Sequence, residues 1–509
     1  MRRILTAAEM RAVDAASSEY GIPGSVLMEN AGEALVRAAQ QMCGPRGKVV
    51  ILCGLGNNGG DGLVAARRLI ATGREVHCEL TGDGVALKGD AARNFEALLA
   101  TGFKMAPVPA ALPVGKGDVV IDALLGTGLS RAPEGRIAEA IERIAKWRAN
   151  GAKVISADLP SGLDSDLGMV REPCVTADRT LAFGYAKRGQ VLEPGVTRCG
   201  LLDIVDIGIP AAAERVLKDA PTWLVSEADA RRPVLPREAS THKGSFGHVL
   251  VVAGSKGKTG AAALAAMGAL RSGAGLVTVA TRADALDQVM RHAPEFMGLE
   301  LRGEGPLGLR DLNSLLDGAE GKSAVVIGPG IARGDETAQL LSDFIEECTS
   351  PVVLDADALN ALVGHLEVLG RAKAQLVLTP HPGELARMLG ITTTELQENR
   401  VAIARSFAVD HRVVLVLKGA RTLIAKPDGS VFINTTGNPG MATGGTGDVL
   451  AGMVGSLIGQ GLPIGDAAVT AVFVHGRAGD VMKAKRGELG LIAGDLLEGM
   501  TEVWRQWER

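Results

Sequence analysis

The most informative stretch of this sequence of 509 residues is a glycine-rich segment at residues 437–452. Five glycines and two threonines of this segment precede Asp448, and apolar residues follow Asp448 at helical spacing. Backbone N–H groups of a glycine-rich loop at a helix N-terminus form an anion site. Asp448 is therefore placed to accept the proton of a hydroxyl group that attacks a bound phosphoryl group. Capping of the helix by Asp448 is the alternative, but a cap needs fewer flexible residues before it.

A second glycine-rich loop, residues 54–62, follows a buried-strand pattern at 48–53 and precedes a helical pattern. Gly54, Gly56 and Gly59 of this loop fit the G-x-G-x-x-G fingerprint of dinucleotide-binding proteins. Glu79 lies where the ribose-binding acid of such a protein belongs. An NAD-dependent dehydrogenase is therefore one interpretation. Asn57, Asn58 and Asp61 argue against it, because a simple pyrophosphate cradle does not need these polar side chains.

The composition narrows the class of protein. The length predicts two or more domains, and abundant Gly and Ala with few aromatic residues favour α/β layers. The net charge of −4 gives no reason to expect nucleic acid or an anionic membrane surface as a partner. The six cysteines form no C-x-x-C pair, and neither a signal peptide nor a transmembrane run of about 18 apolar residues is recognisable. We therefore expect a cytoplasmic protein in a reducing compartment, without a membrane partner.

Two α/β series follow one another along the chain. Strand patterns of the first series lie at residues 48–53, 75–80, 118–121, 153–157 and 179–183, with helical stretches between most of them. This alternation predicts a largely parallel, doubly wound sheet, in which ligands bind beyond the carboxyl ends of the strands. Asp122, Asp158 and the polar cluster at 57–61 each follow such a strand end. We expect these groups to lie close together in space.

The alternation breaks down between residues 209 and 244, where prolines and charged residues cluster. We place the domain boundary there, with one domain at 1–215 and the other at 222–509. The second series has strand patterns at residues 248–253, 324–327, 352–354, 376–378 and 413–417, and a hairpin signal at 427–429. Loop clusters follow several of these strands, at residues 328–330, 355–357, 379–384 and 418–422. The second domain is therefore also expected to be α/β.

With these motifs in order, nearly the whole chain resembles the bifunctional NAD(P)H-hydrate repair enzymes. These enzymes fuse an NAD(P)HX epimerase domain to an ADP-dependent NAD(P)HX dehydratase domain. The resemblance rests on residues 56–67, 122–129 and 158–162 in the first half, and on 379–384, Lys418-Gly419 with Thr422, and 437–452 in the second. Each block alone is moderately specific, whereas all of them in this order are highly specific.

The resemblance implies a substrate, which is NADH or NADPH hydrated at the nicotinamide ring (NADHX or NADPHX) and has two epimers at C6. The first domain is similar to the doubly wound, Rossmann-like epimerase domain of the family. Asp158 would face C6 and move protons while this centre inverts, and Asn58, Asp122 and Ser161 would hold a potassium ion, which prefers oxygen ligands. The residues implied to bind the substrate in this domain are Asn57, Asn58, Gly59, Gly60, Asp61, Gly126, Thr127, Gly128, Leu129, Ser130, Arg131, Ala132 and Asp158.

The second domain resembles a ribokinase-like α/β domain. The resemblance implies that phosphorylation turns the 6-hydroxyl of the S epimer into a better leaving group, so that NAD(P)H, AMP and phosphate are released. Asp448 would be the base, and Thr446 and Gly447 would form part of the anion hole. Ala261, Gly330, His381 and Asp448 would contact the substrate. The residues implied to hold ADP are Lys418, Gly419, Ala420, Arg421, Thr422 and Gly447. A magnesium ion is expected on its phosphates, with Asp355 and Asp357 as candidate ligands. We also expect a homo-oligomer.

One further interpretation remains open from the sequence. A small-molecule kinase, for a vitamin or a sugar, fused to a non-catalytic Rossmann-like binding module would carry many of the same loops. The joint presence of Asn58, Asp122, Asp158 and Ser161 argues against a non-catalytic first domain. A kinase would release a stable phosphorylated product, so the identity of the products distinguishes the two interpretations.

Overall fold

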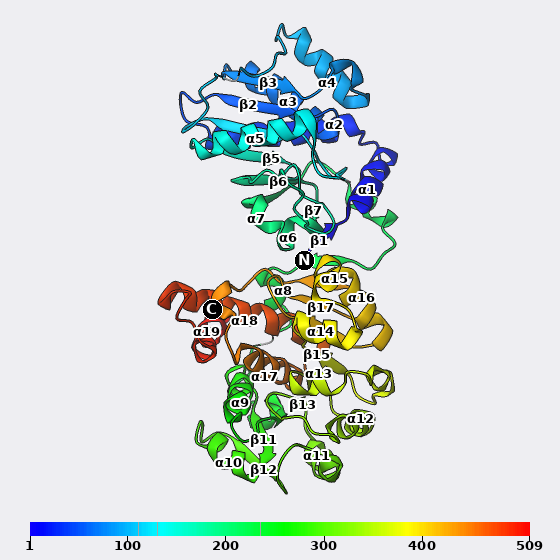
Figure 1. Ribbon diagram of the computed structural model, residues 1–509, viewed down its shortest axis with the longest axis vertical. Helices are drawn as coiled ribbons and strands as arrows, with labels where there is room; N and C mark the ends of the chain where they lie inside the picture. Colours follow the sequence, from blue (N-terminus) through cyan, green and yellow to red (C-terminus); the bar gives the residue numbers. More distant parts are fainter. Residues whose placement is uncertain (110, 130, 235, 509) are drawn as a thin grey trace. The chain divides into compact units, whose positions relative to one another are not determined.

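The computed structural model describes residues 1–109, 111–129, 131–234 and 236–508, which divide into two compact units. One unit is Arg3–Asp219, and the other is Ala220–Arg509 together with Met1–Arg2 (Figure 1). This division falls between the domain ends at 215 and 222 that the sequence suggests. The sequence assigns Met1 to the first domain, whereas its ammonium group donates a hydrogen bond of 2.8 Å to Asp229 of the second unit.

The first unit is built around a parallel sheet with the strand order β3-β2-β4-β5-β6-β8. The strands are β2 (Val49–Cys53), β3 (Val76–Leu80), β4 (Val119–Ala123), β5 (Lys153–Ala157), β6 (Arg179–Phe183) and β8 (Leu201–Val205). Along β2, Val49 and Ile51 join the core formed with α2 and α3, whereas Val50 and Leu52 join the core formed with α5. Both faces of the sheet are therefore buried, as continuous apolar strands predict. The doubly wound parallel sheet expected from the sequence is confirmed.

Seven α-helices of the described residues surround this sheet. They are α1 (Ala7–Glu19), α2 (Gly24–Met42), α3 (Asn57–Ala71), α4 (Gly89–Ala100), α5 (Gly135–Ala149), α6 (Arg188–Val191) and α7 (Val196–Cys199), and the short 3-10 helices are η1 (Gly84–Ala86) and η2 (Ala211–Val216). Strand β1 (Arg2–Leu5) pairs with β7 (Ala186–Lys187), so that Leu5 lies opposite Lys187. The sequence patterns missed β1, β7 and β8. Strand β1 begins with two arginines, β7 has two residues, and β8 lies at the edge of its sheet with no fully buried residue, so each is defined more by its partner than by its own pattern.

The second unit has a sheet with the strand order β12-β11-β10-β13-β14-β15-β16-β17-β18-β9. The strands are β9 (Thr222–Leu224), β10 (His248–Val252), β11 (Leu276–Arg282), β12 (Met297–Leu301), β13 (Ala324–Ile327), β14 (Val352–Leu354), β15 (Leu376–Leu378), β16 (Val414–Leu417), β17 (Leu423–Ala425) and β18 (Val431–Ile433). Strands β10 to β16 pair in parallel, and β17 and β18 form the antiparallel hairpin that the sequence predicts. The sequence patterns missed β9, β11 and β12.

The helices of the second unit include the one that carries Asp448. They are α8 (Glu227–Arg231), α9 (Thr259–Arg271), α10 (Ala283–Met290), α11 (Leu312–Ala319), α12 (Thr337–Glu347), α13 (Asp357–Ala361), α14 (Pro382–Leu389), α15 (Thr393–Glu398), α16 (Arg400–His411), α17 (Thr446–Gly459), α18 (Ile464–Arg486) and α19 (Ala493–Trp507). The short 3-10 helices are η3 (Lys243–Phe246), η4 (Leu309–Asp311), η5 (Leu366–Arg371) and η6 (Pro439–Met441). Helices α17 and α9 approach closely, because a Cβ on Gly452 would lie 1.9 Å from the carbonyl oxygen of Ala265. None of the helices formed by the described residues is both long and apolar enough to cross a membrane.

Candidate functional site

Asp122, at the carboxyl end of β4, is the centre of a buried hydrogen-bond network in the first domain. Its carboxylate accepts hydrogen bonds from Ser156 Oγ (2.9 Å), from Leu124 N–H (3.3 Å), and from both the N–H (2.9 Å) and the Oγ (2.5 Å) of Ser161. Burial raises the pKa of Asp122, while the hydrogen bonds from Ser161 and Ser156 oppose that rise. Pairing of the neighbouring strands β4 and β5 therefore brings Asp122 and Ser161 together, as expected for residues that follow adjacent strands.

Asn58 lies beside this network, in the first turn of α3. Its Nδ2 donates a hydrogen bond of 3.0 Å to the carbonyl of Leu125, and the N–H of Leu125 donates one of 2.9 Å to Ser161 Oγ. The Oδ1 of Asn58 is buried and accepts no hydrogen bond from the described residues. A buried hydrogen-bond acceptor without a partner is unfavourable, so this oxygen fits a site that binds a cation or the hydrogen-bond donor of a ligand.

Asp158 follows β5 in a left-handed backbone conformation with φ of 59°, which is unfavourable for a residue other than glycine. Its Oδ1 accepts hydrogen bonds from Phe183 N–H (3.0 Å) and from the ammonium group of Lys187. Its carbonyl accepts one of 2.6 Å from Gln190 Nε2. The side chain of Lys187 is fully buried. These contacts hold the strained backbone and fix a partly buried ion pair at the carboxyl end of the sheet.

Two further carboxyl groups, Asp61 of α3 and Asp14 of α1, share the electrostatic environment of this ion pair. Burial raises the pKa of Asp61 well above its ordinary value, and Asp158 and Asp14 raise it further while Lys187 lowers it. Burial raises the pKa of Asp14 to about 6, with Lys187 lowering it and Asp158 raising it. The cluster therefore combines a carboxyl group whose pKa is raised well above its ordinary value, a carboxyl group with a pKa of about 6, and an ion pair. Such a combination is suited to acid–base chemistry.

The other residues of the first domain that the sequence assigns to substrate binding lie on two loops. Gly59 and Gly60 are buried in the first turn of α3, where a Cβ on Gly59 would lie 1.9 Å from the carbonyl oxygen of Gly54, and Asn57 is exposed. Gly126 lies next to Asn58, since a Cβ at 126 would lie 3.4 Å from Asn58 Cβ. In the same loop Thr127 and Leu129 are half-buried, Gly128, Arg131 and Ala132 are exposed, and Ser130 lies outside the described residues.

In the second domain, Asp448 lies in the first turn of α17, after Gly445, which has a left-handed φ of 91°. Two charged groups lie beside Gly447, since a Cβ there would lie 3.2 Å from Lys418 Nζ and 3.8 Å from a carboxylate oxygen of Asp355. Lys418 Nζ donates a hydrogen bond of 2.7 Å to the buried carboxylate of Asp355. The ends of β14 and β16 thus bring Asp355 and Lys418 to the N-terminus of α17.

The charges in this cluster perturb one another. Burial, together with the nearby carboxylates of Asp355 and Asp357, raises the pKa of Asp448 to about 7, and Lys418 opposes this rise. Burial alone would lower the pKa of Lys418, but Asp355, Glu384 and Asp448 raise it above its ordinary value. A carboxyl group that titrates near pH 7 beside a permanent ammonium suits a general base next to a bound anion.

Two histidines contact backbone groups at the ends of helices in the second domain. Burial lowers the pKa of His475 to about 4, so its ring is neutral near pH 7. Its Nε2 donates a hydrogen bond of 2.9 Å to the carbonyl oxygen of Thr446. His381 caps α14, because its Nδ1 accepts hydrogen bonds from Gly383 N–H (3.0 Å) and Glu384 N–H (3.3 Å). The side chain of His381 remains 54% exposed, so a substrate contact by its outer edge is sterically open.

The remaining residues that the sequence assigns to the second site lie on loops at strand ends. A Cβ on Gly330, whose φ is 65°, would lie 3.1 Å from Ala261 Cβ, so these two residues are neighbours. Residues 418–422 form the turn between β16 and β17. Thr422 Oγ1 donates a hydrogen bond of 2.9 Å to the Gly419 carbonyl, and Arg400 donates one of 2.9 Å to the Ala420 carbonyl. Arg421 has a left-handed φ of 55°.

Comparison with known proteins gives matches to both domains. The family model described as NAD(P)H-hydrate dehydratase matches residues 249–502, and that described as YjeF-related protein N-terminus matches residues 24–189. The bifunctional NAD(P)H-hydrate repair enzyme of Moorella thermoacetica is 43% identical over 99% of this chain and 97% of its own length. The chain belongs to the bifunctional NAD(P)H-hydrate repair enzymes. The Escherichia coli enzyme of this name is 33% identical over 96% of this chain and 91% of its own length.

Two solved structures similar to this repair enzyme each cover somewhat more than half of the chain. A ribokinase-like superfamily protein from Enterococcus faecalis has a TM-score of 0.50 and 24% identity, covering 57% of this chain and 97% of its own. The ADP/ATP-dependent NAD(P)H-hydrate dehydratase from Bacillus subtilis, co-crystallised with ATP and Mg²⁺, has a TM-score of 0.48 and 32% identity, covering 56% of this chain and 98% of its own. The expected ribokinase-like fold is confirmed by the first of these.

Membership of this family removes the competing interpretations. The repair enzyme is bifunctional, with an epimerase and a dehydratase domain, so it is neither a plain dehydrogenase nor a kinase fused to a non-catalytic module. The local structure agrees with this in the case of Glu79. Its two carboxylate oxygens each accept a hydrogen bond of 3.0 Å from Arg143, and one of them accepts a further bond of 2.7 Å from Val108 N–H. Glu79 therefore has a structural role, not that of a ribose-binding acid.

Sequence reasoning missed three residues that the structure of the repair enzyme brings to the sites: Asp14, Lys187 and His475. Lys187 looks in the sequence like any surface lysine, because burial of a charged side chain leaves no local signal. Asp14 lies on a helix whose amphipathic sequence pattern predicts that this position faces solvent. His475 lies inside an apolar helix, where a polar residue could have been noticed as a buried group in need of a partner.

Proposed function

We propose that residues 1–215 interconvert the R and S epimers of NADHX and NADPHX, and that residues 222–509 dehydrate the S epimer in a reaction that consumes ADP. The observation that carries this assignment for the dehydratase is the titratable carboxyl group of Asp448. It lies at a glycine-rich helix N-terminus beside Lys418. For the epimerase, the observation is the ion pair between Asp158 and the fully buried Lys187.

In the proposed epimerase the substrate binds over the carboxyl ends of β2, β4 and β5, against residues 57–61 and 126–132. In the proposed route, the bond from C6 to the hydroxyl oxygen breaks and reforms on the other face, with a proton moving to and from that oxygen. Asp158 carries out this proton transfer, and the ion pair with Lys187 holds its side chain in place. Asp61, whose pKa burial raises well above its ordinary value, is the neighbouring proton donor.

We assign a potassium ion to Asn58, Asp122 and Ser161. The first support is the buried Oδ1 of Asn58, which accepts no hydrogen bond from the described residues. The second is that the side chains of Asn58 and Ser161, which both bond to the Leu125 backbone, offer oxygen atoms as ligands. A bound cation would complete the coordination of this amide oxygen and orient the loop at 126–132. Because Asp122 already accepts four hydrogen bonds, we expect its main role to be the orientation of Ser161.

In the proposed dehydratase, Asp448 accepts the proton of the 6-hydroxyl while that oxygen forms a bond to the terminal phosphorus of ADP, and AMP leaves. The C6–O bond of the phosphorylated intermediate then breaks, phosphate leaves with the electron pair, and loss of the C5 proton restores the C5–C6 double bond. The N–H groups of Thr446 and Gly447 stabilise the phosphoryl charge. Residues 418–422 hold the nucleotide, and Ala261, Gly330 and His381 line the substrate pocket.

A magnesium ion would neutralise charge on the nucleotide phosphates in this site. Among the described residues, no three His, Cys, Asp or Glu side chains are grouped to hold a metal ion. We therefore assign most of its ligands to phosphate and water, and Asp355 and Asp357 would be the candidate ligands from the protein. We further propose that the enzyme is a cytoplasmic homo-oligomer.

The test is incubation of the purified protein with a mixture of both NADHX epimers, with and without ADP. Without ADP, the ratio of epimers should relax to equilibrium while no NADH forms. With ADP, both epimers should be converted to NADH, because the epimerase supplies the S form, and AMP and phosphate should appear in equal amounts. A stable phosphorylated product would show kinase activity and contradict the proposal.

A further inference from the structure

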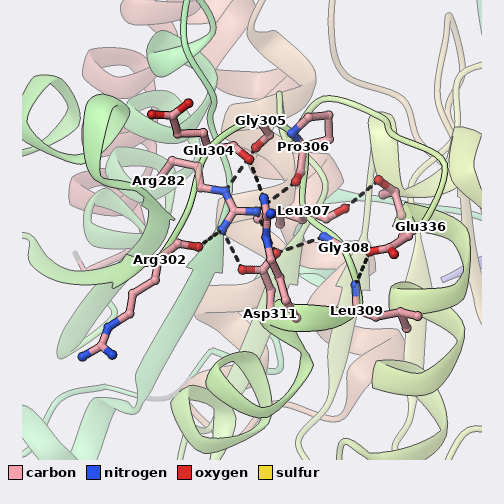
Figure 2. A network of polar contacts seen from close by, with 12 residues as sticks. Arg282, Arg302, Glu304, Gly305, Pro306, Leu307, Gly308, Leu309, Asp311 and Glu336 are labelled. Carbon is pink, nitrogen blue, oxygen red and sulfur yellow. Dashed lines mark hydrogen bonds and ion pairs between the residues drawn. The ribbon is translucent and has the colours of Figure 1, made fainter.

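The carboxyl end of β11 carries a buried arginine, Arg282, that no step of the proposed mechanism uses. Its guanidinium binds both carboxylate oxygens of Asp311, at 2.6 and 2.7 Å, as Figure 2 shows. It also donates hydrogen bonds to the carbonyl oxygens of Arg302 (2.6 Å), Gly305 (3.1 Å) and Pro306 (2.9 Å). Arg282 is 4% exposed and Asp311 is 2% exposed. One side chain therefore fixes the whole loop at 302–311, which follows the edge strand β12.

The fixed loop in turn holds the segment at 328–337, which follows β13. Thr337 Oγ1 donates a hydrogen bond of 2.8 Å to the Leu307 carbonyl and accepts one of 2.9 Å from Gly334 N–H. The two loops are also in direct contact, since a Cβ on Gly334 would lie 2.9 Å from Pro306. Thr337 is 1% exposed, so both of its hydrogen bonds are protected from water.

The segment at 328–337 contains Gly330, which forms the proposed substrate pocket with Ala261. The Gly330 carbonyl accepts a hydrogen bond of 2.8 Å from Ser255 Oγ, and Gly254 N–H donates one of 2.8 Å to the Pro329 carbonyl. Gly330 is thus tied on one side to the loop after β10, and through Thr337 on the other side to the loop that Arg282 organises. Movement of the loop at 302–311 would release only the second of these ties.

We propose that Arg282 and Thr337 are positioning residues that set the width of the substrate pocket of the dehydratase domain. This inference rests on the proposed assignment of Gly330 and Ala261 to that pocket. Arginine is required at 282, because its planar fork presents five donors, and the structure uses them on one carboxylate and three carbonyls. Lysine has a single ammonium group with a different geometry and reaches fewer of these acceptors.

Three variants of the full-length enzyme test the inference. Thr337→Val keeps the shape of the side chain but removes both hydrogen bonds, Thr337→Ser keeps the hydroxyl, and Arg282→Lys keeps the charge without the fork. Arg371→Lys is the matched control, because Arg371 pairs with Glu346 at 2.7 Å on an exposed surface of the same domain. Kinetic constants for the S epimer and for ADP, and hydrogen exchange of the amides in 328–334, are measured for each.

For Thr337→Val the loss of this hydrogen-bonded link should raise the KM for the S epimer about 3- to 10-fold. For Arg282→Lys we expect a rise of about 10-fold or more, since several hydrogen bonds are lost. In both variants kcat and the KM for ADP should change less than about twofold, and exchange at 328–334 should accelerate. Thr337→Ser and Arg371→Lys should behave like the wild type.

Two results would overturn the inference. One is an unchanged KM for the S epimer in both Thr337→Val and Arg282→Lys, with only a lowered melting temperature, which would make the cluster purely structural. The other is unchanged exchange at 328–334. The exchange measurement needs no catalysis, so it tests the link from Arg282 to Gly330 independently. Failure of the wild-type enzyme to dehydrate the S epimer would instead contradict the proposed function.

Discussion

Replacement of Asp448 by Asn removes the proposed base of the dehydratase while keeping the size of its side chain. Burial and the charge of Asp355 raise the pKa of Asp448 to about 7. The reactive carboxylate is therefore present in about half of the molecules at pH 7 and in about a tenth of them at pH 6. The wild-type rate should fall about tenfold per pH unit below pH 7 and level off above it. Asp448→Asn should lose about 10²–10⁴-fold in kcat at pH 8, the usual contribution of a general base.

The same perturbed pKa predicts that Asp448→Asn is more stable than the wild type. The folded-state pKa lies above the ordinary value of 3.8, so the native state binds more protons than the unfolded state between these two values. The wild type therefore loses stability as the pH rises from about 4 to about 7, by at most about 4 kcal/mol. Asn carries no charge at either pH, so the stabilisation by Asp448→Asn should be present at pH 8 and largely absent at pH 4. Urea unfolding at both pH values measures it.

The assay follows NADH formation from the purified S epimer between pH 6 and pH 9, with ADP binding measured by calorimetry on the same protein. Binding should persist in Asp448→Asn, because Lys418 and the Gly447 backbone are unchanged. Asp355→Asn removes a neighbouring negative charge, so the acid limb of its profile should move to lower pH. A wild-type profile that is flat between pH 6 and pH 8, or an Asp448→Asn variant that still dehydrates, would refute Asp448 as the base.

Three other predictions concern the first domain and the boundary. Asp158→Asn should slow epimerisation by about 10²–10⁴-fold and leave dehydration of pure S epimer intact, and a near-normal epimerisation rate would reduce Asp158 to a structural role. Asn58→Ala should remove any stimulation of epimerisation by potassium over sodium, measured in matched salts, and persistent stimulation would place the ion elsewhere. Fragments 1–215 and 222–509 should each fold, and the first should epimerise without nucleotide; two insoluble fragments would mean that the boundary is wrong.

Much of the fold was predictable because many of its strands are apolar on both faces. The runs that form β2, β13 and β16 stand out in the sequence, since parallel strands buried on both sides need continuous apolar residues. Strands β7 and β12 did not stand out, because the first has two residues and the second lies at the edge of its sheet with Met297 exposed. Such strands are defined by pairing with residues distant in the sequence.

The candidate sites were predictable where a loop motif and its chemistry lie in one segment. The residues around Asp448 and Asn58 are of this kind, because glycines and polar side chains at a strand–helix junction have few other uses. Lys187 and Asp14 were not predictable, because their relation to Asp158 exists only after the sheet and its flanking helices have formed. The link from Arg282 to Gly330 was equally hidden, since it passes through backbone carbonyl groups that carry no sequence signal.

By itself, the sequence determined which family this protein belongs to, that it has two α/β domains, and which loops lie at the ends of their strands. These features follow from local patterns of apolar residues, glycines and motif spacing. Only the tertiary structure decided how the pKa values of the buried carboxyl groups shift. Asp61 and Asp448 are ordinary aspartates in the sequence, and burial together with neighbouring charges raises the pKa of each. The physical reason is that burial and electrostatic interaction depend on distances in space, which the order of residues along a chain does not specify.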